Sequence, residues 1–98
     1  MIVEYIRYRV PEARGEELED AYRHAAASLE ASPHCQRYEL SRCIDEPGVS
    51  VVRIEWDSAE GHMSRFRSSP EFRAFFEAVR PFADEIEEMR HYEVKLAG

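Results

Sequence analysis

The sequence predicts an α+β protein of ferredoxin-like architecture: a four-stranded antiparallel sheet with helices on one face, in the order β-α-β-β-α-β. Three observations predict it. Four segments alternate apolar and polar residues with period two, as strands do. Two segments between them repeat apolar residues at helical spacing. A turn motif, Asp45-Glu46-Pro47-Gly48, joins the second and third strand segments and predicts a hairpin.

The first strand is predicted over Ile2–Val10, where β-branched and aromatic residues alternate with charged ones. Glu4 is an exception, because it falls on the otherwise apolar face near the start of the strand. A helix is expected from about residue 12 to residue 31, and the alanines along its apolar stripe suit close packing against a sheet. Ser32-Pro33 ends this helix, because the residue before a proline avoids the α-helical region.

The second and third strands are predicted over His34–Ile44 and Val49–Trp56, and the third ends on the only tryptophan of the chain. A helical region follows and breaks at Ser69-Pro70, where serine suits an N-cap and proline suits the first helical position. The chain closes with a strand predicted over Met89–Leu96. The helix after the break carries an apolar stripe formed by Phe72, Phe75, Phe76 and Val79.

Period-two alternation assigns the strand residues to the two faces of the sheet. The face under the helices is expected to hold the mostly apolar set Ile2, Ile6, Tyr8, Tyr38, Leu40, Val52, Ile54, Trp56, Tyr92 and Val94. The opposite face is expected to hold the charged set Arg7, Arg9, Arg37, Glu39, Arg53, Glu55, His91 and Glu93. Charges of both signs interleave there, as cross-strand pairing favours. This face is either a solvated surface or the interface of a homodimer in which two sheets meet, and we predict the homodimer.

Composition excludes several classes of partner. The 98 residues suffice for one domain, residues 1–98, but not for two separate cores. The net charge of −7 argues against binding nucleic acid or an anionic membrane surface, because both need a basic patch. No apolar run approaches the roughly 20 residues of a membrane span, and the first residues do not form a signal peptide. We therefore expect a cytoplasmic protein that binds neither nucleic acid nor membranes.

The sequence contains no metal or cofactor motif. None of the four histidines lies at ligand spacing from another histidine, a cysteine or a carboxylate on one predicted helical face, which argues against a zinc or iron site. The glycines are isolated, so there is no phosphate-binding loop. Cys35 and Cys43 are too far apart along one predicted strand to form a disulfide, and free thiols are expected. We expect no cofactor and no metal.

An aromatic set with a few polar members is the best candidate for a functional site. Besides Trp56 and His62, the set comprises Tyr8, Tyr38, Phe66, Phe72, Phe76 and Tyr92, all expected to point between sheet and helices. Small-molecule sites are mostly apolar with a few placed polar groups, which tyrosine hydroxyls, an indole N–H and an imidazole would supply. His62 lies on the inward stripe of its helix, where a neutral imidazole serves as a base or orients a phenol. The competing interpretation is that these side chains only fill the core.

The order of elements, the strand-end motif Glu55-Trp56-Asp57-Ser58, His62 and the motif Ser69-Pro70-Glu71-Phe72 make the chain similar to the antibiotic biosynthesis monooxygenase domain family. The similarity implies a dimeric α+β barrel, in which the sheets of two subunits pack together, and a pocket between sheet and helices. It also implies cofactor-independent oxygenation of a small phenolic or quinol-type aromatic, which loses a proton and reacts with O2 as an anion. On this resemblance Trp56 and His62 are the candidate catalytic residues, and a tyrosine, Tyr8, Tyr38 or Tyr92, positions the substrate.

The haem-degrading branch of the same superfamily differs from this chain. It uses an asparagine on the first strand, a tryptophan on the helix after Trp56 and a histidine on the next helix. At these positions the chain has Arg7 or Tyr8, Arg65 and Phe75, so haem cleavage of that type is not expected. Two other functions remain open on the same fold: a ligand-binding or accessory dimer without turnover, and an isomerase or cyclase that uses the pocket without oxygen.

Overall fold

A computed structural model describes the backbone of residues 1–98 and the side chains of residues 1–60 and 64–98. The helices and strands are β1 (Ile2–Arg9), η1 (Glu12–Arg14), α1 (Gly15–Ala31), β2 (Cys35–Arg42), β3 (Val49–Trp56), η2 (Gly61–Phe66), α2 (Pro70–Val79), η3 (Arg80–Glu85) and β4 (Ile86–Glu93). The predicted α+β order is confirmed, with η1, η2 and η3 as short 3-10 or π segments beside the longer elements.

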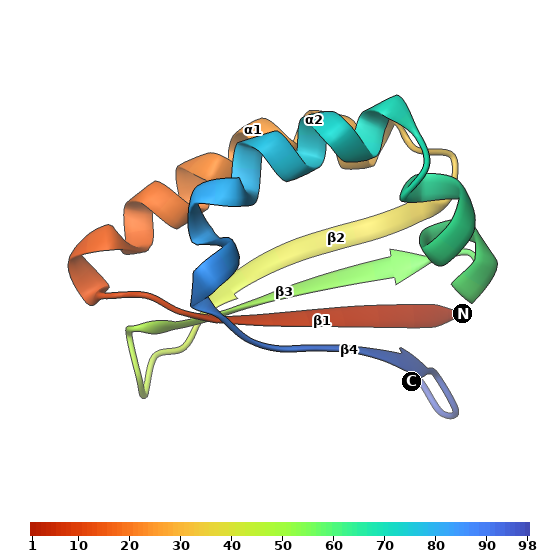
Figure 1. Ribbon diagram of the computed structural model, residues 1–98. Coiled ribbons are helices and arrows are strands. Elements are labelled where there is room, and N and C mark those ends of the chain that lie inside the picture. Colours follow the sequence, from red (N-terminus) through yellow and green to blue (C-terminus); the bar gives the residue numbers. More distant parts are fainter.

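The sheet has the strand order β2-β3-β1-β4, and every neighbouring pair is antiparallel. Figure 1 shows α1 and α2 side by side over one face of this sheet, while the other face carries no helix. The hairpin predicted at the Asp45–Gly48 turn joins β2 to β3. Strands β1 and β3 therefore occupy the centre of the sheet, and β2 and β4 form its edges.

The hydrophobic core lies between the sheet and the two long helices. Strands β1 and β3 contribute Tyr8, Val52, Ile54 and Trp56, all almost completely buried. The predicted stripe of α1 packs onto them through Leu18, Tyr22, Ala25 and Leu29. From the stripe of α2, Phe75 and Val79 are buried, whereas Phe76 is 44% exposed. One face of each amphipathic element is thus removed from water, which is the main source of stability in so small a domain.

Strand β4 differs from the prediction in both its bounds and its facing. It spans Ile86–Glu93 rather than Met89–Leu96, and Leu96 is 93% exposed. Its register pairs Val3 with Tyr92 and Glu4 with His91, so Tyr92 lies on the helix-free face and His91 on the helix-covered face. Both assignments were predicted the other way round. Residues 87–93 of this edge strand are exposed on both faces. The alternation of apolar and polar residues along them therefore did not indicate which face is covered by the helices.

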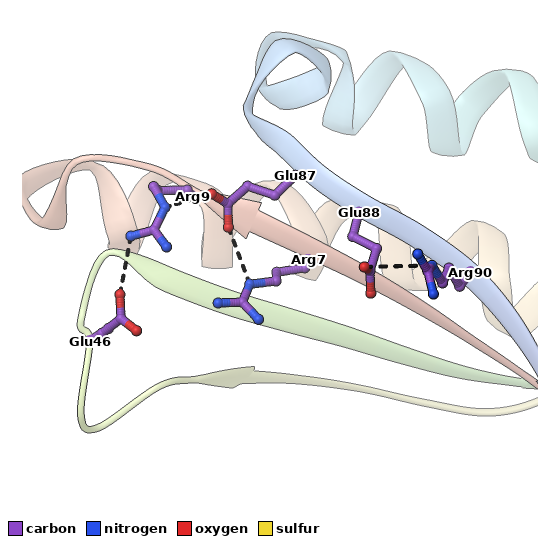
Figure 2. A network of polar contacts seen from close by, with 6 residues as sticks. All are labelled: Arg7, Arg9, Glu46, Glu87, Glu88 and Arg90. Atoms are coloured by element: carbon purple, nitrogen blue, oxygen red, sulfur yellow. Dashed lines mark hydrogen bonds and ion pairs between the residues drawn. The ribbon is translucent and has the colours of Figure 1, made fainter.

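The helix-free face carries the predicted mixture of charges, apart from His91 and Glu93. Figure 2 shows part of it, in which Glu87 accepts hydrogen bonds from Arg7 and Arg9 at 3.1 and 2.6 Å. Arg9 also reaches Glu46 in the β2–β3 turn at 3.2 Å. On the central strands Arg53 pairs with Glu55 and donates to the Tyr5 hydroxyl. The charges of this face therefore pair within one subunit.

The structure also bears on the cysteines and on membrane-spanning helices. Cys35 and Cys43 are both free, as predicted. Among the described residues, no helix is at once long enough and apolar enough to cross a bilayer.

Candidate functional site

A cavity of about 270 Å³ lies between the helix-covered face of the sheet and the second helical region. Its walls come from β1, β3, β4, the end of η2, α2 and η3. The lining residues are Glu4, Ile6, Tyr8, Ile54, Trp56, Phe66, Arg67, Phe72, Phe75, Phe76, Val79, Ala83, Ile86 and Met89. We refer to this space as the Trp56 cavity. It is mostly apolar with a few polar groups, the composition typical of small-molecule sites.

One wall of the Trp56 cavity is a continuous group of aromatic rings. The rings of Trp56 and Phe66 lie 4.8 Å apart between centroids, and Phe66 meets Phe72 edge-on at 5.6 Å. Phe72 in turn stacks on Phe76 at 6.0 Å. These separations are those of favourable aromatic pairs.

The start of α2 positions this wall. Ser69 caps the helix by accepting a hydrogen bond from the Phe72 backbone N–H at 3.2 Å, and Pro70 occupies the first turn, as predicted. The helix phase then turns Phe72, Phe75 and Phe76 toward the sheet. Because Phe76 is partly exposed, it forms the rim of the cavity rather than its floor.

Glu4 is the acidic group of the cavity. Its side chain points under the helices from β1 and is only 2% exposed. The Trp56 indole Nε1–H donates to Glu4 Oε1 at 3.1 Å, and His91 Nε2 lies 3.7 Å from Glu4 Oε2. Burial raises the pKa of the Glu4 carboxyl to about 7, although the Trp56 hydrogen bond and the charge of Arg67 act in the opposite direction.

Two tyrosines form a buried polar pair behind the aromatic wall. The hydroxyl groups of Tyr8 and Tyr22 share a hydrogen bond of 2.6 Å, and their rings meet edge-on. Burial raises the pKa of both hydroxyls, so they are neutral near pH 7. Tyr8 lines the Trp56 cavity, whereas Tyr22 does not.

The structure brings together most of the predicted site residues. Those that line the Trp56 cavity are Trp56, Tyr8, Phe66, Phe72 and Phe76. Tyr38 does not line it, because its hydroxyl bonds to Glu30 at the outer side of α1. Tyr92 lies on the opposite face of the sheet, 46% exposed, with its ring 5.5 Å from that of Tyr5. The side chain of His62, the predicted base, lies outside the described residues.

Sequence reasoning did not assign three charged or polar residues of this region to the site: Glu4, Arg67 and His91. Glu4 had a visible signature, a lone carboxylate on the apolar face of a strand. Arg67 lines the cavity from the segment between η2 and α2, and no sequence pattern marked it. His91 was assigned to the other face, so its approach to Glu4 was not anticipated.

A second depression, of about 420 Å³, lies between α1 and β2. Although it is larger, it is an open groove with Glu19, Arg23 and Glu39 among its lining residues. Charged side chains at an open surface bind water well and hold an apolar ligand poorly. The Trp56 cavity is therefore the better candidate site. Among the described residues, no group of three histidine, cysteine or acidic side chains is arranged to hold a metal ion.

Residues 1–78 match the sequence profile of the family described as antibiotic biosynthesis monooxygenase. A Bacillus subtilis protein, YczJ, described as uncharacterized, is 26% identical over 93 residues, which cover 95% of this chain and 98% of the relative.

Solved structures share the fold at low sequence identity. A variant of SnoaB, described as a cofactor-independent oxygenase from Streptomyces nogalater, superimposes with a TM-score of 0.80 at 18% identity. That similarity covers 98% of this chain and 94% of SnoaB. A conserved protein from Methanosarcina mazei gives a TM-score of 0.78 at 14% identity, covering 96% and 92% of the two chains.

Proposed function

The chain belongs to the antibiotic biosynthesis monooxygenase family, and from that premise we propose that it is a cofactor-independent monooxygenase of a small hydroxylated aromatic compound. The substrate class is an electron-rich phenol, quinol or anthrone. The observation that carries the proposal is the Trp56 cavity, in which aromatic walls meet a buried carboxylate.

The cavity supports this substrate class in two ways. The tilted and edge-on rings of Trp56, Phe66 and Phe72 form an aromatic wall that suits an aromatic ligand. Glu4 and Arg67 supply the polar contacts that orient a ligand hydroxyl group within an otherwise apolar space. SnoaB, whose fold is similar, is described as a cofactor-independent oxygenase, which favours the same chemistry here.

The proposed reaction uses O2 as the oxidant and needs no other electron source. An anthrone-type substrate loses a proton from its ring-flanked methylene carbon, and the electron pair stays on the carbon as a delocalised anion. The anion passes one electron to O2, and the resulting radical pair combines into a peroxide. Loss of water from the protonated peroxide leaves a carbonyl group. The methylene carbon thus gains one oxygen atom of O2, and the other oxygen atom leaves as water.

We also propose that the protein is a homodimer joined through the helix-free face of the sheet. Tyr5, Val51 and Tyr92 lie in a shallow hollow on that face, together with Arg7 and Glu88. Apolar and aromatic groups surrounded by paired charges are typical of interfaces between subunits. The charges already pair within one subunit, so two such faces meet without leaving isolated charges buried.

Oxygen uptake tests the proposed function. The purified protein, supplied with EDTA and no flavin, is mixed with a panel of anthrones and naphthohydroquinones in an oxygen electrode cell. We expect uptake above the buffer rate for at least one compound, with one O2 consumed per anthrone. A compound that binds, as shown by quenching of Trp56 fluorescence, without any excess uptake favours the accessory-dimer function. A product formed equally well under nitrogen favours an isomerase or cyclase.

A further inference from the structure

We propose that Glu4 is the catalytic base of the Trp56 cavity and removes the proton that makes the bound aromatic reactive toward O2. The inference rests on the proposed function and deepens it, because it assigns the proton-transfer step to one side chain. Among residues 1–60 and 64–98, Glu4 is the only carboxylate that lines the cavity.

The geometry places the Glu4 carboxylate where a ligand would meet it. Glu4 lies on the central strand β1, paired across the sheet with Ile54 on one side and His91 on the other. Oε1 is held by the Trp56 indole at 3.1 Å, so the carboxylate is fixed beside the aromatic wall. A substrate held in the Trp56 cavity therefore lies next to both the aromatic wall and the acidic group.

The hydrogen bond from Trp56 does not by itself require a carboxylate at this position. Accepting the Trp56 N–H requires only a neutral acceptor, which glutamine would supply. A carboxylate that is only 2% exposed costs free energy when it is ionised, even with the Trp56 N–H and His91 beside it. Local departures of this kind concentrate at functional sites, where a shifted proton affinity is useful.

Burial raises the pKa of Glu4 toward neutral pH, and the Trp56 hydrogen bond and the charge of Arg67 oppose that rise. Among residues 1–60 and 64–98, the groups that approach Glu4 or act on it include Tyr8 from β1, Tyr22 from α1, Trp56 from β3, Arg67 from the segment before α2, and His91 from β4. The pKa of His91 is lowered, first by burial and then by Arg67, so His91 is neutral at pH 7. The pKa of Glu4 is raised to about 7, which is near the best value for a general base at that pH.

The proton can be followed through the whole reaction. The Glu4 carboxylate takes a proton from the substrate methylene: a C–H bond breaks, an O–H bond forms on the carboxyl, and the electron pair remains on the substrate. After O2 has added, the carboxyl returns this proton to the peroxide anion. The regenerated carboxylate then takes the remaining C–H proton as the peroxide O–O bond breaks and hydroxide leaves. That proton and the hydroxide together make the water released.

Hydrogen exchange tests the base separately from the oxygenation. Under nitrogen in D2O, the protein is mixed with anthrone, and loss of the methylene proton signal is followed by NMR. We expect the wild-type protein to accelerate exchange above the buffer rate, and exchange at the buffer rate would overturn the proposal. Accelerated exchange that is lost in Glu4→Gln, without aerobic O2 uptake, would support Glu4 as the base while refuting the monooxygenase function.

Substitution assigns the exchange to Glu4. Glu4→Gln keeps an acceptor for the Trp56 N–H but cannot take a proton, and we expect exchange at pH 8 to fall by about 100-fold or more. The matched control is Glu93→Gln, which removes an exposed carboxylate of β4 that pairs with Lys95 and does not line the cavity. Quenching of Trp56 fluorescence by anthrone shows that each variant still binds. Wild-type exchange in Glu4→Gln would overturn the proposal.

Trp56→Phe provides a test that does not depend on the folding of Glu4→Gln. The substitution keeps the Glu4 carboxylate and removes the indole N–H that stabilises its ionised form. We expect the acidic limb of the pH–rate profile for exchange to move to higher pH, while Glu93→Gln leaves it in place. A limb that does not move in Trp56→Phe would contradict the assignment of the base to Glu4.

Discussion

At the scale of single residues, Glu4 couples the stability of the fold to pH. The pKa of this carboxyl rises from an ordinary value of 4.5 to about 7 in the folded protein, chiefly because of burial. Between these two pH values the folded state binds more protons at Glu4 than the unfolded state does. The contribution of Glu4 to stability therefore decreases as pH rises through this range, and above pH 7 the ionised group destabilises the fold.

Glu4→Gln is expected to remove this dependence. At pH 8 the variant should be more stable than the wild type by about 2 to 3 kcal/mol, and near pH 4 the two should be nearly equal. Urea denaturation at several pH values, analysed as the difference between variant and wild type, measures the effect. The difference is needed because other carboxylates, such as Asp57 and Glu87, have lowered pKa values and respond in the opposite direction. A difference that does not change with pH would contradict the account.

Glu4 also shows where residue-level prediction stops. Its position on an apolar face could be read from the alternation in β1. Its partner Trp56 lies 52 residues away in the chain, and their hydrogen bond depends on the register between β1 and β3. Nothing local to either residue encodes that register. The aromatic side chains of the site could therefore be predicted from the sequence. The place of Glu4 among them could be seen only in the folded structure.

At the scale of elements, α2 carries one phenylalanine that packs in the core and another that forms the rim of the cavity. Phe75 and Phe76 are adjacent on this helix and both line the Trp56 cavity, but Phe75 is 7% exposed and Phe76 is 44% exposed. The first ring packs against Phe66 and Tyr22, whereas the second stacks only on Phe72 among the described ring contacts. Their removal should therefore have different consequences.

We expect Phe75→Ala to lower the free energy of unfolding by about 3 to 5 kcal/mol, because it leaves a hole in the core. Phe76→Ala should cost only about 1 to 2 kcal/mol, because its ring is already half in water. The second variant should nevertheless weaken anthrone binding, measured by Trp56 fluorescence, since it removes the rim of the cavity. The control Arg73→Ala lies on the exposed side of the same helix and should change neither quantity. Unchanged binding in Phe76→Ala would place the ligand elsewhere.

Elements with one buried face could be predicted from the sequence, and elements without one could not. Strand β3 begins and ends where the alternation placed it, at Val49 and Trp56, because every second residue enters the core. The break at Ser69-Pro70 was equally legible, since capping chemistry is local. Strand β4 is an edge strand exposed beyond Ile86, and its register also shifts opposite Arg7 and Tyr8. The bounds of β4, and the face of the sheet on which each of its side chains lies, depend on pairing with β1. The local sequence of β4 does not indicate that pairing.

At the scale of the whole molecule, the proposed homodimer depends on the helix-free face of the sheet. The sheet is covered on one side by α1 and α2 and carries no helix on the other (Figure 1). Figure 2 shows how ion pairs such as Arg7–Glu87 already neutralise charges on the second side. A face with paired charges and half-buried apolar groups such as Val51 can be covered by a second copy without burying an isolated charge.

We expect the wild-type protein to sediment as a dimer. Val51→Asp, which replaces an apolar side chain with a charge in the middle of the helix-free face, should shift it to the monomer without unfolding it. The control Ala27→Asp adds the same charge on the exposed side of α1 and should leave the dimer intact. Sedimentation velocity of the three proteins at one concentration measures this. A monomeric wild type, or a dimer that Val51→Asp does not affect, would refute an interface on this face.

The proposed function requires O2 to react in the Trp56 cavity, and isotope labelling measures that reaction directly. The purified protein, free of metal and flavin, is incubated with anthrone under ¹⁸O2, and the product is analysed by mass spectrometry. We predict a quinone that carries one ¹⁸O atom, formed faster than in buffer, with the rate reduced about 100-fold in Glu4→Gln. A folded protein that binds anthrone and yields no labelled product above the buffer rate would contradict the account.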